Sequence, residues 1–247
     1  AAGDLNGDGL DDLVCGGSLG YMAQLFFQQP DGTFLVENLF GYTDSLPSKT
    51  SEDQGLLLFD ADGDKDLDLY IASGGYESKP GSSDYQDRLY INQGDGKFVP
   101  DAQALPQIFV SKSCVKAADM DRDGDLDLVV GGRVEPGKYP SSVQSFLFRN
   151  DSKNGLIRFT DVTAQIAPEL MKAGMICDAI FTDINNDDWQ DLVLAGEWMP
   201  IIILQNEKGK FRGNAGLEAL KHASGWWNYL VSGDVDNDGD VDYIAGN

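Results

Sequence analysis

A nine-residue acidic loop recurs five times along this 247-residue chain, and its spacing limits what the chain can fold into. In the copy at residues 119–127, aspartates occupy positions 1, 3, 5 and 9, and Gly124 occupies position 6. The loops begin at residues 4, 60, 119, 183 and 234, so their starts are 51 to 64 residues apart. A solvated acidic face would not repeat this spacing or follow each loop with the same apolar run. The chain is therefore built from repeats of one structural unit.

Loops of this composition suit a hard divalent cation such as calcium, which takes about six to eight oxygen ligands. Alternate residues can reach one ion only if the backbone curls around it, and glycine at position 6 permits that turn at no steric cost. The carbonyl of position 7 would add a neutral oxygen. The sequence predicts up to five calcium sites, with ligands at positions 1, 3, 5, 7 and 9 of each loop: Asp4, Asn6, Asp8, Leu10 and Asp12; Asp60, Asp62, Asp64, Asp66 and Asp68; Asp119, Asp121, Asp123, Asp125 and Asp127; Asp183, Asn185, Asp187, Trp189 and Asp191; Asp234, Asp236, Asp238, Asp240 and Asp242.

Two of the loops depart from the pattern. Lys65 and Asp188 replace glycine at position 6, where a side chain forced to positive φ costs on the order of 1 kcal/mol. We expect the loops at 60–68 and 183–191 to bind calcium more weakly than those at 4–12, 119–127 and 234–242. An EF-hand is the rival interpretation, and it fails because position 12 should be a glutamate between helices. Position 12 is instead an apolar residue or cysteine in a strand-like run: Cys15, Ile71, Val130, Leu194 and Ala245.

Short apolar runs before and after each loop predict two strands, and a third strand and an aromatic-led fourth follow across a Gly-rich turn. Four antiparallel strands in about 40–60 residues is the size of a propeller blade. We therefore expect an all-β fold, a β-propeller of four-stranded antiparallel blades. Complete blades are expected at about 54–106, 113–166 and 175–219, with partial blades at 1–50 and 226–247. Since both ends cut through a repeat, we expect a four- to five-blade portion of a longer protein.

These motifs resemble the FG-GAP/VCBS repeat family, whose propeller repeats are also found in integrin α subunits. The resemblance covers essentially the whole chain. It depends on the D-x-[DN]-x-D-x-x-x-D loops, the D-L-[VY] strands after them, and hairpins such as residues 92–98, NQGDGKF. The stretches GGRVEPGKYP and AGEWMP are most similar to bacterial secreted or surface members of the Bacteroidetes type. The resemblance implies a calcium-bearing propeller, usually seven-bladed, exposed outside the cytoplasm. It implies no single activity, because members serve in adhesion, ligand binding or carbohydrate association, and a few enzymes use a similar propeller.

The net charge of −23 is concentrated in the loops, which hold 18 aspartates at positions 1, 3, 5 and 9. The acidity that remains argues against nucleic acid or an anionic membrane as a partner, since both need a basic patch. No apolar run is long enough to span a bilayer. Cys15, Cys114 and Cys177 lie in strand-like runs and are expected to be buried free thiols, although one disulfide stays an alternative.

Signals for an enzyme are sparse, and we expect no catalytic residue in this portion. His222 is the only histidine, and the acids outside the loops that follow second strands, Glu77, Glu135 and Glu197, are either solvated or a candidate acid pair. The long connections after second strands instead favour a binding surface. Its candidate residues are Tyr76, Tyr85, Tyr139 and Trp198, unless they pack between blades; one of Trp226 and Trp227 should be core.

The sequence therefore predicts a calcium-stabilised module at the cell surface or outside the cell that binds a protein or a carbohydrate. Two alternatives remain. One is an accessory or catalytic propeller of a polysaccharide-degrading enzyme. The other is a structural subunit of a larger surface assembly.

Overall fold

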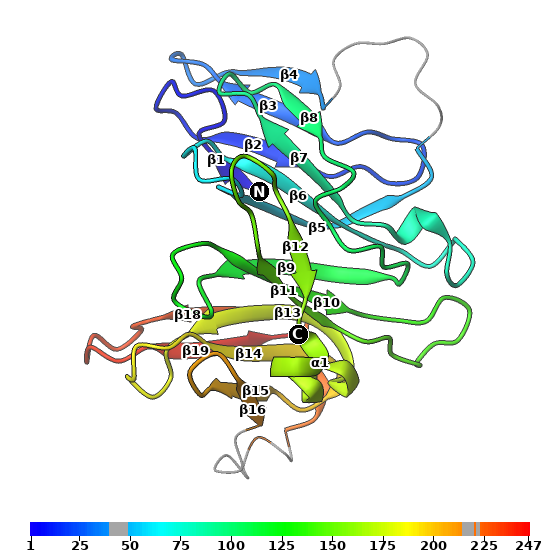
Figure 1. Ribbon diagram of the computed structural model, residues 1–247, viewed down its shortest axis with the longest axis vertical. Helices are drawn as coiled ribbons and strands as arrows, with labels where there is room; N and C mark the ends of the chain where they lie inside the picture. The colour runs from blue at the N-terminus through cyan, green and yellow to red at the C-terminus, as the bar shows by residue number, and fades with distance from the viewer. Residues whose placement is uncertain (40–48, 214–219, 221–222) are drawn as a thin grey trace.

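The computed structural model describes residues 1–39, 49–213, 220 and 223–247, and it confirms the all-β fold. Among these residues, five antiparallel sheets follow one another in chain order (Figure 1). The first sheet contains β1 (Ala2–Gly3), β2 (Asp12–Cys15), β3 (Gln24–Gln28) and β4 (Phe34–Asn38). The second contains β5 (Glu52–Phe59), β6 (Asp68–Gly74), β7 (Arg88–Asn92) and β8 (Phe98–Pro100). The third contains β9 (Lys112–Ala118), β10 (Asp127–Gly132), β11 (Phe146–Asn150) and β12 (Phe159–Asp161).

The fourth sheet is enlarged by one strand from the connection that follows it. It contains β13 (Met175–Thr182), β14 (Asp191–Met199), β15 (Ile202–Asn206) and β16 (Phe211–Gly213), and β17 (Gly225–Trp226) pairs with β14. The fifth sheet contains β18 (Tyr229–Gly233) and β19 (Asp242–Gly246). Each four-stranded sheet runs first strand to fourth in sequence order, as in a propeller blade.

The second strand of each inner sheet is a continuous apolar run because it is buried on both faces. Successive side chains of a strand point to opposite faces of its sheet. On β6, Leu69 and Ile71 therefore pack toward the first sheet, while Tyr70 and Ala72 pack toward the third. Strands β10 and β14 alternate in the same way between their two neighbours. The hydrophobic core is thus a series of layers between sheets, so each sheet depends on the next for burial.

The first strands of successive sheets lie against one another: β5 against β9, β9 against β13, and β13 against β18. Each of the three long first strands carries a β-bulge, which leaves one residue without a partner on the second strand: Gln54, Ser113 and Cys177. The bulge interrupts the apolar alternation. This explains why the apolar run before each of these loops marks only the second half of the strand.

Short helical segments complete the fold, namely η1 (Ser83–Tyr85), α1 (Thr163–Ile166) and η2 (Pro168–Lys172). Among the described residues, no helix has the length and hydrophobicity needed to cross a bilayer. All three cysteines are free thiols. Cys114 is buried as expected, but Cys177 is only half-buried, and Cys15 is exposed because it lies on a face of β2 that no sheet of the described residues covers. His222 and the ends of two expected blades, at 40–48 and 214–219, lie outside the described residues.

Candidate functional site

Each acidic loop joins a first strand to a second and folds around the carboxylate at its first position. In the loop 119–127, Asp119 Oδ1 accepts the N–H of Asp123 at 3.2 Å, and Asp119 Oδ2 accepts the N–H of Gly124 at 3.1 Å. Asp123 Oδ1 in turn accepts the N–H of Asp125 at 3.0 Å. The bond from position 6 to position 1 recurs in the four other loops, at Asp4, Asp60, Asp183 and Asp234. The five loops therefore share one backbone conformation.

Positive φ is required at two positions of this conformation. Position 6 has a φ of 99° at Gly124, 79° at Lys65 and 66° at Asp188, so the side chains of Lys65 and Asp188 are held where glycine is favoured. Position 4 also has positive φ in every loop, a feature the sequence analysis missed. Its occupants are Gly7, Gly63, Arg122, Asn186 and Asn237. Asparagine and glycine, which tolerate this region, fill four of these five positions and could have signalled it.

The carboxylate at position 9 is buried in the first four loops, where it ties three segments together. Asp127 Oδ2 accepts the N–H of Met120 in its own loop at 3.1 Å, and Asp127 Oδ1 accepts the N–H of Asn150 on β11 at 2.8 Å. Asp12, Asp68 and Asp191 make the same pair of bonds in their sheets. Burial raises the pKa of Asp68 and of Asp127 to about 7. Both groups therefore lie in a setting that opposes their negative charge unless a cation is close by.

Three of the loops bring three carboxylates together. Positions 1, 3 and 9 each contribute an oxygen, all within 4.8 Å of one another: Asp60, Asp62 and Asp68; Asp119, Asp121 and Asp127; Asp234, Asp236 and Asp242. In the loops at 4–12 and 183–191, position 3 is an asparagine, Asn6 or Asn185, whose amide oxygen accepts the N–H of position 5 as the carboxylates of Asp62 and Asp236 do. An all-oxygen set of this kind fits a hard divalent cation.

One carboxylate oxygen of these groups has no hydrogen-bond partner among the described residues. Asp121 Oδ1 is buried and unpaired among the described residues. Its pKa is raised by burial and by the neighbouring Asp123. A buried anionic oxygen without a donor is costly. The loop 119–127 therefore has the chemistry of a cation site, because one of its carboxylate oxygens is buried and accepts no hydrogen bond from the described residues.

The first three loops are each also bound to the next sheet along the chain. Asn92 at the end of β7 donates its side-chain N–H to the carbonyl of Leu5, the second residue of the preceding loop, at 2.8 Å. Asn150 reaches Ala61 in the same way, at 3.4 Å, and Asn206 reaches Met120 at 2.8 Å. Sequence reasoning used these asparagines only as the start of a hairpin motif. Their recurrence at one position of the second, third and fourth hairpins could have signalled a contact between repeats.

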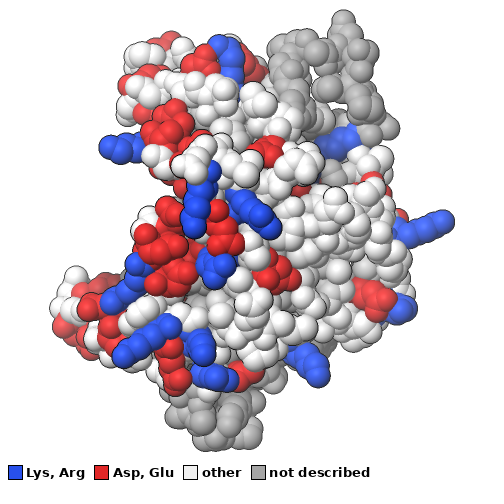
Figure 2. Space-filling view, in the orientation of Figure 1, with Lys and Arg blue, Asp and Glu red and all other residues white. Residues whose placement is uncertain are grey.

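The acidic loops gather along one side of the molecule, where Figure 2 shows most of the red carboxylates of this face, at one end of the sheets. The loops at 119–127 and 183–191 touch each other directly. The Arg122 guanidinium lies 4.7 Å from the ring centre of Trp189 and also donates to the carbonyl of Asp188. Trp189, expected to offer only its carbonyl to an ion, thus also packs its ring against the preceding loop.

Connections between second and third strands leave from the opposite end of each antiparallel sheet. There the structure brings together three of the four expected ligand-face residues. The Tyr139 N–H donates to the Tyr76 hydroxyl at 3.4 Å, and Trp198 Nε1 donates to the Tyr139 hydroxyl at 2.6 Å. Trp226 joins them, with its ring centre 5.2 Å from that of Trp198. Its partner Trp227 packs against the core between the fourth and fifth sheets, as expected for one of the pair.

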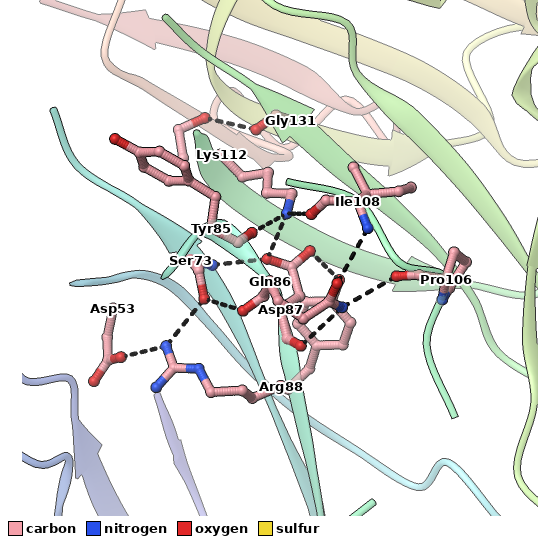
Figure 3. A network of polar contacts seen from close by, with 12 residues as sticks. Asp53, Ser73, Tyr85, Gln86, Asp87, Arg88, Pro106, Ile108, Lys112 and Gly131 are labelled. Atoms are coloured by element: carbon pink, nitrogen blue, oxygen red, sulfur yellow. Dashed lines mark hydrogen bonds and ion pairs between the residues drawn. The ribbon is translucent and has the colours of Figure 1, made fainter. Parts of the chain in front are cut away.

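Tyr85 does not belong to this surface, so its expected exposure was wrong. It is 1% exposed, and its hydroxyl donates to the carbonyl of Ser78 at 2.7 Å. Its carbonyl accepts a hydrogen bond from Lys112 Nζ at 2.5 Å (Figure 3). Lys112 Nζ also lies 3.1 Å from Asp87 Oδ1, and this buried ion pair joins the third sheet to the second. Tyr85 is therefore part of the packing between sheets.

The three acids outside the loops have different environments. Glu197 is buried, and its Oε1 accepts Arg133 Nε at 2.8 Å while its Oε2 accepts the Tyr139 hydroxyl at 3.0 Å. Glu135 pairs with Lys138 at 2.6 Å. Glu77 lies beside Glu52, whose pKa is raised by burial and then by the Glu77 charge. Only Glu77 therefore takes part in a close pair of carboxylates.

Comparisons with known proteins agree with the repeat architecture. No curated protein matches the chain significantly. Among solved structures, rhamnogalacturonan lyase YesW matches with a TM-score of 0.51 and 14% identity over 99% of this chain. This chain spans 45% of that lyase's chain, and at 14% identity the likeness concerns the fold alone. The family model of the FG-GAP-like repeat matches residues 4–71, 60–130 and 183–245, which is more than half of the chain. The chain therefore belongs to the FG-GAP-like repeat family.

Proposed function

We propose that this chain is a calcium-stabilised β-propeller segment that binds a protein or carbohydrate ligand outside the cell or at its surface. The observation that supports the calcium part most directly is the unpaired, buried Oδ1 of Asp121 within a group of three converging carboxylates. FG-GAP-like repeats often bind calcium and are typical of extracellular proteins, and they are usually non-catalytic. The exposed rings of Tyr76, Tyr139 and Trp198 favour ligand binding at the opposite end of the sheets.

Positions 1, 3, 5, 7 and 9 of the loops would hold the ions. When bound, calcium supplies positive charge that offsets repulsion between the clustered carboxylates. Two contacts would carry the effect of a bound ion to the rest of the fold. The Asp127 carboxylate holds β11 to the loop, and Asn206 holds that loop to the fourth sheet. A loop stabilised by an ion would therefore stabilise the contact between neighbouring sheets, and ligand occupancy adds to stability by mass action.

The test is calcium titration of metal-free protein by calorimetry, with thermal unfolding measured in parallel. We expect several ions per chain and a rise in Tm on adding calcium. The Asp121→Asn variant should lose about one ion per chain. Asp95→Asn is the matched control, because Asp95 is an exposed aspartate outside the loops. A wild-type chain that neither binds calcium nor changes its Tm would contradict the calcium proposal.

The second candidate is a catalytic propeller that degrades a polysaccharide, and the Glu52–Glu77 pair favours it. The pair combines a carboxyl group of raised pKa, Glu52, with one of lowered pKa, Glu77, whose carboxylate accepts the Tyr76 N–H at 2.9 Å. Two acids of different pKa can divide the roles of acid and base. Cleavage of a polysaccharide that is lost in Glu77→Gln but kept in Glu135→Gln would favour this candidate over a binding module.

A further inference from the structure

We propose that the aromatic rings of Tyr76, Tyr139, Trp198 and Trp226 form a binding site for a neutral oligosaccharide. We call these four residues the aromatic strip. The inference deepens the proposed binding function and depends on it, because it names the ligand class and the residues that contact the ligand.

The aromatic strip is continuous and crosses three repeats. Tyr76 follows β6 in the second sheet, Tyr139 follows β10 in the third, and Trp198 and Trp226 belong to β14 and β17 of the fourth. Each residue is in contact with the next: the Tyr139 backbone N–H donates to the Tyr76 hydroxyl, Trp198 Nε1 donates to the Tyr139 hydroxyl, and the rings of Trp198 and Trp226 touch. A surface that extends across several repeats suits an extended chain of sugar units rather than a single small molecule.

The backbone projects Trp198 outward at a cost in conformational energy. Glu197 pairs with Trp226 and Met199 pairs with Gly225, so Trp198 lies in a β-bulge without a partner of its own. Its φ is 58°, a left-handed value that is rare for a bulky residue. Bulges often re-aim a side chain next to a functional site, and strain of this kind is stored where function needs it. The outward position of Trp198 is therefore specified by the fold.

A buried carboxylate holds the aromatic strip rigid. Glu197 is 2% exposed and accepts hydrogen bonds from both Arg133 and the Tyr139 hydroxyl, which itself accepts the indole N–H of Trp198. The Tyr139 hydroxyl and the Trp198 indole N–H thus already have hydrogen-bond partners in the protein. The rings remain accessible, with Trp198 61%, Tyr76 45%, Tyr139 45% and Trp226 42% exposed. A ligand would therefore meet flat ring faces that need little ordering on binding.

A pyranose ring offers the complementary surface. It has an apolar face of C–H groups, slightly positive, which can stack on the negative face of an aromatic ring. Hydroxyl groups at its rim remain free to bind water or the neighbouring side chains. A cation held between rings is excluded at Trp198 and Trp226, because their centres are only 5.2 Å apart and the rings touch.

Local charges favour a neutral sugar over an acidic one. Two cations among the described residues that flank the strip are already paired, Arg133 with Glu197 and Lys138 with Glu135. Glu52 and Glu77 add negative charge near Tyr76. A uronic acid would find no free cation among these residues and would be repelled at the Tyr76 end.

The experiment is affinity electrophoresis of the calcium-loaded chain in gels containing galactan, mannan or mixed-linkage β-glucan, with polygalacturonate as the acidic comparison. Calorimetry with oligosaccharides of the retarding polymer then gives affinities. We expect retardation by at least one neutral polymer and a loss of affinity of about tenfold or more in Trp198→Ala and in Trp226→Ala. Leu156→Ala is the control, because Leu156 is exposed in the β11–β12 turn at the opposite end of the sheet and should bind like wild type.

Trp198→Gly guards against misfolding, since glycine accepts the positive φ of this position. It should keep the Tm near that of wild type while losing binding. Failure of every neutral polymer to retard the wild-type chain, or tryptophan variants that bind like wild type, would overturn the inference. Binding of polygalacturonate or of a protein alone would also overturn it but would leave the binding-module proposal standing. The calcium titration tests the metal part of that proposal separately.

Discussion

Lys65 occupies a backbone position that suits glycine. Its φ of 79° places the side chain in the left-handed region, and its N–H still donates to Asp60 Oδ2 at 2.9 Å, as the glycine N–H does in other loops. The loop conformation is therefore kept at the expense of local strain. The same holds for Asp188, but aspartate tolerates this region better than lysine does.

Replacing Lys65 by glycine should therefore stabilise the protein. We expect Lys65→Gly to raise the free energy of unfolding by about 1 kcal/mol, because removal of Cβ strain exceeds the added freedom of the unfolded chain. Loss of a cation beside the loop should also strengthen calcium binding. Urea denaturation at saturating calcium and calorimetric titration measure the two effects.

Lys97→Gly is the matched control for this prediction. Lys97 is an exposed lysine in the β7–β8 turn and is not among the non-glycine residues with positive φ. Glycine at position 97 should lower stability, because it adds freedom to the unfolded chain and removes the exposed ion pair with Asp95 without relieving any strain. If Lys65→Gly lowers stability as much as Lys97→Gly does, the strain argument is wrong.

Among the structural elements, the second, third and fourth hairpins each use one asparagine for the contact between repeats. Asn92 is 2% exposed and uses both ends of its amide. Its Nδ2 donates to the carbonyls of Leu5 and Leu67, and its Oδ1 accepts the N–H groups of Gly94 and Gly96. One side chain thus closes its own turn and holds the preceding acidic loop.

We predict that Asn92→Ala lowers the free energy of unfolding by about 2–3 kcal/mol, because it leaves several buried backbone groups without partners. Gln93→Ala changes the neighbouring, exposed residue of the same turn and should alter stability by less than about 0.5 kcal/mol. Denaturant unfolding of both variants in calcium checks the difference. Equal effects of the two substitutions would show that the link between repeats contributes nothing.

Much of this architecture could be predicted at the level of the element, because it depends on periodic signals. The loops repeat a fixed pattern of carboxylates, and strands such as β6 are apolar without interruption since both faces are buried. The early halves of β5, β9 and β13 could not be predicted, because a bulge at Gln54, Ser113 or Cys177 shifts the alternation. Periodicity also gave no sign of α1 and η2, which lie in a connection.

The candidate site was predictable only in part, because sequence spacing does not show which connections meet in space. Tyr76, Tyr139 and Trp198 were expected on a ligand face, and they are in contact. Tyr85 has the same residue type and lies in the same connection as Tyr76, yet it turns into the buried contact with Lys112. Trp226 reaches the strip only because β17 pairs with β14, an additional strand that the four-strand unit does not contain.

At the scale of the whole molecule, charge and fold are coupled through the buried position-9 aspartates. Burial raises the pKa of Asp68 and of Asp127 to about 7, well above the ordinary value of 3.8. A carboxyl group whose pKa is higher in the folded state favours folding while it is protonated, and this contribution is lost as pH rises from about 4 to about 7. A bound cation should remove the loss by stabilising the ionised form.

Metal-free protein should therefore become less stable as pH rises from 5 to 8, whereas calcium-loaded protein should change little. One pKa unit corresponds to about 1.4 kcal/mol, so two carboxylates shifted by several units amount to several kcal/mol. The measurement is Tm at pH 5, 6, 7 and 8, after removal of metal on a chelating resin and after adding back calcium. Acids such as Asp84 do not titrate in this pH range. Hydrogen bonds from Thr50, Ser78 and Ser82 lower the pKa of Asp84, so it stays ionised at pH 5 and above.

Asp68→Asn and Asp127→Asn should each reduce this pH dependence in the metal-free protein, because an amide at position 9 does not titrate. The variants should also bind less calcium. The pH profile of the metal-free variants measures the effect of the charge at position 9, and calcium titration measures its contribution as a ligand. Asp95→Asn, at an exposed aspartate, should leave the pH profile unchanged. A metal-free wild-type protein whose Tm stays constant or rises from pH 5 to 8 would mean that these carboxylates do not oppose folding. Calcium would then have no electrostatic cost to relieve at position 9.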